Sequence, residues 1–163
     1  MAKANEADKE KADKKKAGKF LIGVLACMVT VEMIILFLTL GLSLEKVVSY
    51  NITTLWQAIF IIPLHLPTFI TSGMWSIMAA LTIGAFIGGL VMKQIKKGIL
   101  VSIISFGLLL FLQLAVGFLF NFDALIAWYS LISSLGGNVI VDFLVSAFIL
   151  IAAGAIGGAL TRE

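Results

Sequence analysis

Long apolar runs with almost no charge constrain this sequence more than any other feature. The first run, Phe20 to Leu42, has 23 residues and a single carboxylate, Glu32. As a helix rising about 1.5 Å per residue it measures about 34 Å, enough to cross the roughly 30 Å hydrocarbon core of a bilayer. Only 13% of the residues are charged and 61% are hydrophobic, whereas soluble domains carry about 25% charged residues. We therefore expect an all-α integral membrane protein.

Four such runs predict about four transmembrane helices. Lys93 follows the second run and Arg162 follows the fourth, as basic residues do at the membrane boundary. Together the four runs define one transmembrane domain over residues 20–163, preceded by a tail. The expected spans are residues 20–42, 74–92, 99–120 and 139–160.

Two shorter apolar segments lie between the expected spans. Residues 55–70 are interrupted by Pro63 and Pro67, and residues 124–135 end at a Gly-Gly-Asn turn. Proline removes helix hydrogen bonds, and bare backbone cannot face lipid. We expect both segments to be re-entrant or interfacial on the outer side. The alternative is that both cross, which gives six spans.

The basic residues predict the orientation. Residues 1–19 form a charged tail that lacks large apolar residues after Met1, so we expect it to be disordered or at most a short helix. This tail, the loop at residues 93–97 and the C-terminus hold eleven of the twelve lysines and arginines. Basic residues favour the cytoplasmic face. The prediction is a multi-pass protein of the cell membrane with both termini in the cytoplasm.

The two halves of the chain resemble each other. At an offset of 69 residues, Ile87-Gly88-Gly89 aligns with Ile156-Gly157-Gly158, and Lys93 aligns with Arg162. One interpretation is an internal two-helix duplication whose halves share one orientation. The other is a chance match, because small apolar residues are frequent in such sequences.

Glu32 and Gln113 lie within the expected spans and are candidates for an intramembrane site. Glu32 is near the middle of the first span, where a charge costs about 2.5–3.5 kcal/mol. It is either an ion or proton site, or a neutral carboxyl group that binds a neighbouring helix or a partner chain. Gln113 in the third span is its candidate partner and is otherwise an interhelical hydrogen-bonding group.

His65, the only histidine, lies between the two prolines. It is either a pH-sensitive or pore-lining group or a residue that satisfies the broken backbone. We expect no metal site, because no further ligands are near it in the sequence. Asp142 is expected in the first turn of the fourth span, where its charge suits the helix dipole.

Small residues at a spacing of four predict helix-packing faces. Such faces allow helix backbones to approach closely in lipid. We expect the second and fourth spans to pack tightly, against each other or against a second copy. The residues concerned are Ala80, Gly84 and Gly88 in the second span and Gly154 and Gly158 in the fourth.

The expected spans contain many small residues at a helix-packing spacing and few polar residues. It has no phosphate-binding loop, no zinc-protease motif and no nucleophile elbow, so we expect no catalytic residues and no cofactor. The leading hypothesis is a non-catalytic subunit of a membrane complex or a homo-oligomer, with lipid and protein partners and no nucleic acid. The alternative is a small ion, proton or solute channel or transporter that uses Glu32.

Overall fold

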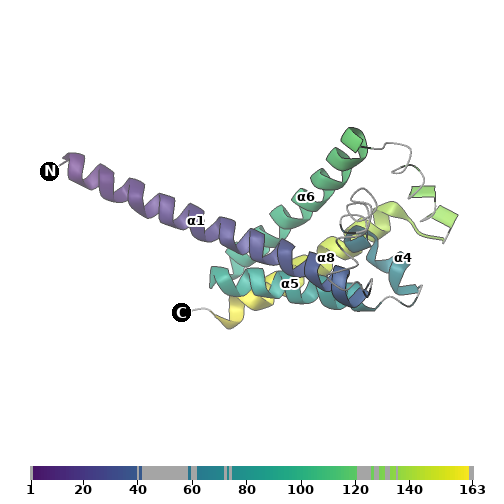
Figure 1. Cartoon of the computed structure of the whole chain (residues 1–163). Coiled ribbons are helices and arrows are strands. Elements are labelled where there is room, and N and C mark those ends of the chain that lie inside the picture. Colours follow the sequence, from purple (N-terminus) through teal and green to yellow (C-terminus); the bar gives the residue numbers. More distant parts are fainter. Residues whose placement is uncertain are drawn as a thin grey trace.

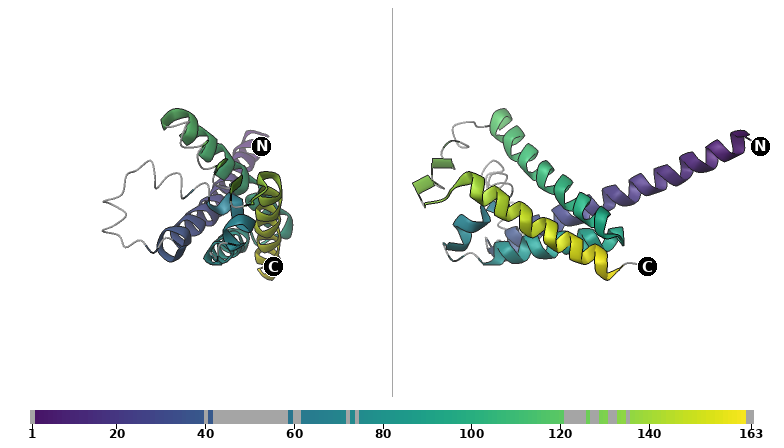
Figure 2. Two further views of the ribbon diagram at one scale, coloured as in Figure 1. Left: turned by 90° about the vertical axis from the view of Figure 1, so that its right-hand side faces the viewer. Right: turned by 180° about the vertical axis from the view of Figure 1, so that it is seen from behind.

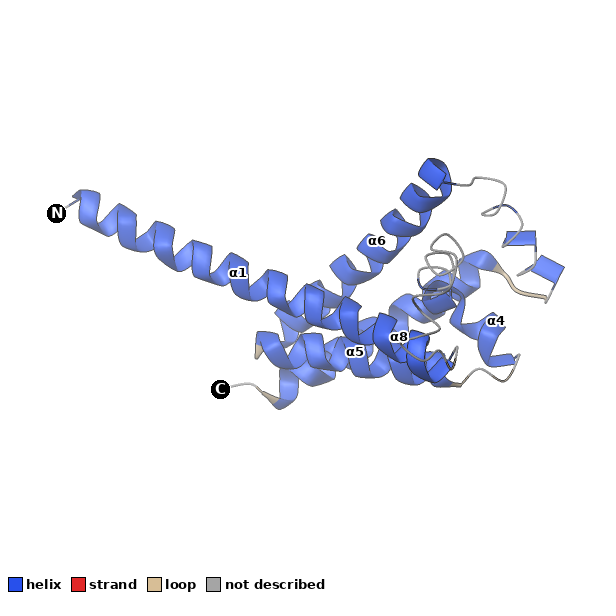
Figure 3. Ribbon diagram, in the orientation of Figure 1, coloured by secondary structure: helices blue, strands red, loops and turns tan. Residues whose placement is uncertain are grey.

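The structure, a computed structural model, describes most of the chain. In this part of the chain the regular elements are helices and none is a strand (Figure 3), which confirms the all-α prediction. The described residues are 2–39, 41, 59, 62–71, 73, 75–120, 126, 129–130, 133–134 and 136–161.

The first helix is longer than expected. Helix α1 runs over Ala2–Ile34 and continues as a π-helical turn, η1, over Ile35–Thr39. The charged tail is thus helical and projects beyond the other helices (Figure 1). Alanine, lysine and glutamate are good helix formers, and extending an existing helix avoids the cost of nucleation. The helix in this tail is therefore longer than the short helix that its composition suggests.

Among the described residues, three helices are long and apolar enough to cross a membrane. They are Lys16–Leu38 within α1 and η1, Ile95–Ala115 within α6 (Ile95–Phe120), and α8 (Val139–Leu160). The expected second span is α5 (Ser76–Met92), an apolar helix of 17 residues. Its length of about 25 Å is less than the roughly 30 Å of the hydrocarbon core.

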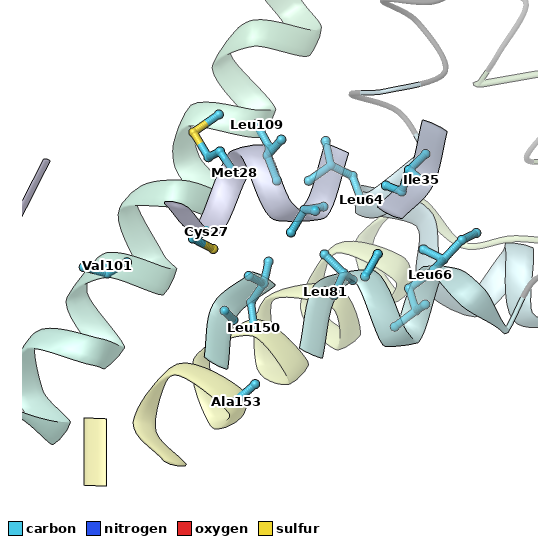
Figure 4. Packing of buried hydrophobic residues seen from close by; sticks show 14 of the residues in the cluster. Cys27, Met28, Ile35, Leu64, Leu66, Leu81, Val101, Leu109, Leu150 and Ala153 are labelled. Carbon is cyan, nitrogen blue, oxygen red and sulfur yellow. The ribbon is translucent and has the colours of Figure 1, made fainter. Parts of the chain in front are cut away.

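Helices α1, α5, α6 and α8 pack with alternating direction. Helix α5 is antiparallel to α1, and the chain reverses direction at the turn of Lys93 and Gln94 before α6. Helix α8 runs in the same direction as α5, so both ends of the chain lie at one end of the molecule (Figures 1 and 2). A short broken helix, η2 (Ile62–His65) and α4 (Leu66–Thr71), lies at the opposite end. Apolar side chains from all these elements form one buried cluster (Figure 4).

Glycines make the same contacts in both antiparallel helix pairs. A Cβ added to Gly84 in α5 would meet Val31 and, at 2.8 Å, the Cys27 carbonyl oxygen of α1. A Cβ added to Gly154 in α8 would meet Ser102 and, also at 2.8 Å, the Gly98 carbonyl oxygen of α6. The second set of contacts repeats the first about 70 positions later in the chain.

Gly88 and Gly158 repeat the pattern one helical turn further on. Their added Cβ atoms would lie 3.0 Å from the Gly23 carbonyl oxygen and 2.6 Å from the Gln94 carbonyl oxygen, respectively. The α1–α5 pair and the α6–α8 pair are therefore packed alike. Ala80, one turn before Gly84, is also buried.

Helices α5 and α8 join the two pairs. A Cβ added to Gly89 would meet the Gly154 carbonyl oxygen and would lie 2.9 Å from the Gly158 nitrogen. A Cβ added to Gly157 would meet the Phe86 carbonyl oxygen. Backbone thus faces backbone along this contact, which brings α8 into position beside the broken helix.

Candidate functional site

The broken helix η2–α4 is held against α8 by Ser146. The Ser146 hydroxyl donates a hydrogen bond to the Leu64 carbonyl oxygen at 3.1 Å and accepts one from the Leu66 N–H at 3.3 Å. Pro67 cannot donate a backbone hydrogen bond, and the segment contains a change from 3₁₀ to α-helix. A side chain of α8 therefore satisfies backbone groups at this break. The sequence alone suggests His65 for this role.

His65 instead pairs with Asp142 of α8. Its Nδ1 lies 3.2 Å from Asp142 Oδ2, and both side chains are buried, with 0% and 2% of their surface exposed. Thr68 Oγ1 donates a second hydrogen bond to the same carboxylate oxygen at 2.5 Å. Since this oxygen accepts, His65 Nδ1 acts as the donor. The result is a buried cluster of His65, Thr68, Asp142 and Ser146, called the His–Asp cluster below.

Aromatic rings enclose the His65 imidazole. The Phe143 ring is tilted against it with the centroids 5.0 Å apart, and the Tyr129 ring meets it edge-on at 5.7 Å. Gln113 of α6 donates from Nε2 to the Tyr129 hydroxyl at 3.1 Å. Polar and aromatic groups from α6, η2, α4 and α8 thus converge at this end of the bundle.

Two buried atoms of this network have no hydrogen-bond partner among the described residues. They are His65 Nε2 and Gln113 Oε1. An unpaired buried polar atom costs about 1–3 kcal/mol, so native proteins rarely leave one without a reason. With Nδ1 donating to Asp142, Nε2 of a neutral His65 is an acceptor, as is Gln113 Oε1. A small group that donates hydrogen bonds can satisfy either atom.

Burial governs the protonation of the two titratable neighbours in this network. Burial lowers the pKa of His65 below its ordinary 6.5, and the hydrogen bond and charge of Asp142 oppose that shift. Burial raises the pKa of Tyr129 above 10.0, and its hydrogen bond with Gln113 opposes that shift. At neutral pH the imidazole is therefore neutral, and it becomes charged only after taking up a proton at Nε2.

The start of α8 positions Asp142. Asn138 caps the helix by accepting hydrogen bonds from Ile140 N at 3.1 Å and Val141 N at 3.3 Å. Asp142 lies in the first turn, as predicted from the sequence. Its carboxylate does more than suit the helix dipole, because it binds His65 and Thr68.

The His65–Asp142 pairing is not evident from either residue alone, although the sequence contains a signal for it. Asp142 and Ser146 are four residues apart and therefore share one face of an otherwise apolar helix. His65 and Thr68 are three apart and share a face of the broken helix. Two polar pairs in apolar surroundings each need a partner, so matching them would have suggested the cluster.

Glu32 and Gln113 are not brought together. Gln113 is buried, with 3% of its surface exposed, and its amide nitrogen binds Tyr129. Glu32 is half-buried on α1, and no hydrogen bond or ion pair to it occurs in the described part of the chain. The proposed Glu32–Gln113 hydrogen bond is therefore absent from the described contacts.

No metal centre is apparent in the described residues, which contain no group of three or more potential metal-ligating side chains. Comparisons with protein-family models, with curated proteins and with solved structures give no match. The His–Asp cluster and the arrangement of apolar helices therefore carry the argument about function. The class they define is a small membrane protein.

Proposed function

We propose that this chain is a small multi-pass transport protein in which the His65–Asp142 pair takes up and releases a proton. The observation that carries the proposal is the buried ionisable pair at a broken helix, with His65 Nε2 lacking a hydrogen-bond partner among the described residues. Ionisable residues buried in membrane proteins are costly, and broken helices in transporters form solute and ion sites.

The chemistry follows from the contacts of His65. Proton uptake at Nε2 converts the neutral ring to an imidazolium ion that stays hydrogen-bonded to Asp142 through Nδ1. Burial opposes this charge and Asp142 favours it, so the two effects set the proton affinity. Thr68 and Ser146 tie the broken helix to α8. A change in the charge of His65 therefore acts directly on how this segment packs.

Four crossings in the cell membrane, with both termini in the cytoplasm, are part of the proposal. The short α5 packs along α1 and α8, and a bilayer can thin locally to match a short helix. The turn at Lys93–Gln94 makes α6 start where α5 ends. The proposal includes no catalytic residue, no cofactor and no nucleic-acid partner.

Proton flux into liposomes tests the proposal. Purified protein is reconstituted with an internal pH-sensitive dye, and valinomycin with potassium on both sides removes the membrane potential. We expect an imposed pH gradient to collapse faster than in protein-free liposomes. Asp142→Asn should return the rate to the protein-free level, whereas Glu32→Gln, which lies outside the cluster, should not change it.

Two outcomes would reject the transport proposal. Wild-type protein that conducts no faster than empty liposomes would reject transport of protons. Loss of flux in Glu32→Gln with retention in Asp142→Asn would move the site from the His–Asp cluster to α1. Circular dichroism of each variant establishes that the helices are retained.

A second candidate, a subunit that binds other membrane helices, is favoured by Glu32. This carboxyl is half-buried in an apolar helix and has no partner among the described residues. A basic or hydrogen-bonding group of another chain would satisfy it. The glycine faces contribute less to this reading, because Gly84, Gly88, Gly154 and Gly158 already contact helices of the same chain. If Glu32 binds a partner, Glu32→Gln should weaken co-purification in mild detergent and Asp142→Asn should not.

A further inference from the structure

A basic pocket lies at the end of the molecule away from the His–Asp cluster. Its volume is about 960 Å³, and it is lined by the first part of the membrane-crossing stretch of α1 and by the turn between α5 and α6. Among the described residues that line it there is no carboxylate. Five of its lining residues are lysines, namely Lys16, Lys19, Lys93, Lys96 and Lys97.

The lysines of the pocket lie where positive charge is electrostatically unfavourable. Lys96 and Lys97 lie in the first turn of α6, where the helix dipole is already positive. Lys19 approaches from α1, and all three side chains are exposed. Like charges near a helix N-terminus repel each other and the dipole, and a bound anion relieves both effects. Lys16 and Lys93 also make other contacts, so the anion is placed at Lys19, Lys96 and Lys97.

The other lining residues indicate an amphiphilic ligand. Phe20, Met92, Ile95 and Leu100 also line the pocket, and Leu100 is 46% exposed. The membrane-crossing stretches of α1 and α6 begin at Lys16 and Ile95. The lysines are therefore placed at the level of lipid headgroups, and the apolar residues are placed where acyl chains begin.

We propose that this pocket binds the headgroup of an anionic phospholipid from the surrounding membrane. The phosphate lies among Lys19, Lys96 and Lys97, near the α6 N-terminus, and the acyl chains follow the apolar side chains into the bilayer. Basic pockets between membrane helices are a known kind of site for anionic headgroups. This inference is independent of the transport proposal, since it uses none of the residues of the His–Asp cluster.

Native mass spectrometry of the full chain in detergent, titrated with lipid, tests the inference. The probes are phosphatidylglycerol, phosphatidylcholine and inorganic phosphate. We expect one phosphatidylglycerol per chain to bind more tightly than phosphatidylcholine. Substitution of Lys19, Lys96 and Lys97 by glutamine should weaken that binding about 100-fold, at about fivefold per lysine. The corresponding arginine variant should retain it and shows that the fold tolerates changes at these positions.

A matched control removes the same charge elsewhere. Lys3, Lys9 and Lys11 lie in the same helix, five or more residues before Lys16. Their triple substitution by glutamine should leave phosphatidylglycerol binding unchanged. An equal loss in this control would reduce the effect to overall charge and overturn the site. Inorganic phosphate that displaces the lipid at equal concentration would overturn the assignment to lipid. Equal binding of phosphatidylcholine would overturn the requirement for an anion.

Discussion

The close contact between α5 and α8 can be tested by adding one methyl group at Gly89. A Cβ there would meet the Gly154 carbonyl oxygen and would lie 2.9 Å from the Gly158 nitrogen. Both are backbone atoms of α8, so no flexible side chain can move aside. The helices must separate, and overpacking of this kind costs about 1–3 kcal/mol. Alanine also stabilises the helix by about 1 kcal/mol relative to glycine because of its higher helix propensity, and this gain offsets part of that cost.

Gly107→Ala is the matched control for Gly89→Ala. Gly107 is within α6, and a Cβ added there would meet no atom of the described residues within 4 Å. Both variants gain the same propensity, so the difference between their unfolding free energies isolates the clash. We expect Gly89→Ala to be the less stable by about 1–3 kcal/mol.

The assay is reversible unfolding in mixed micelles with increasing sodium dodecyl sulfate, followed by circular dichroism. Wild type, Gly89→Ala and Gly107→Ala are compared under identical conditions. Equal stability of the two variants would show that α5 and α8 do not approach as closely as the structure places them. The reasoning from glycine contacts would then fail for the whole bundle.

Two further predictions concern protonation and topology. Because the folded state lowers the pKa of His65, stability from the neutral imidazole is fully present above pH 6.5 and is lost as pH falls through the lower folded-state pKa. The free energy of unfolding should decrease as the pH falls across this range in wild type, and it should decrease less steeply in His65→Gln. Parallel pH dependences of the two proteins would contradict this prediction. In a Cys27→Ser background, single cysteines at Lys15 and Lys96 should react with a membrane-impermeant maleimide from the same side of the membrane. Labelling from opposite sides would exclude an even number of crossings between them.

Much of the fold follows from local sequence properties. Hydrophobic runs mark the membrane helices because lipid-facing residues must be apolar along the whole crossing, and α8 has the bounds predicted for the fourth span. The spacing of Gly84 and Gly88 predicts a packing face, since close approach of two helices needs small residues on one side of a helix. The sequence did not identify which helix each face contacts.

The His–Asp cluster was harder to predict because it depends on contacts distant in the sequence. His65 and Asp142 are 77 positions apart, and periodicity carries no information about such a pair. Glu32 is the more obvious candidate in the sequence because it lies in the middle of a span. Asp142 lies near a helix end, where a charge needs no special explanation. Only the path of the broken helix across α8 shows that Asp142 is buried.

A double-mutant cycle between His65 and Asp142 tests the central claim most directly. Unfolding free energies are measured for wild type, His65→Gln, Asp142→Asn and the double variant in the same detergent. If the two side chains pair as in the structure, the single effects should fail to add, with a coupling of about 1–3 kcal/mol. Effects that add to within about 0.5 kcal/mol would show that the residues do not interact, and the proposed functional centre would have no basis.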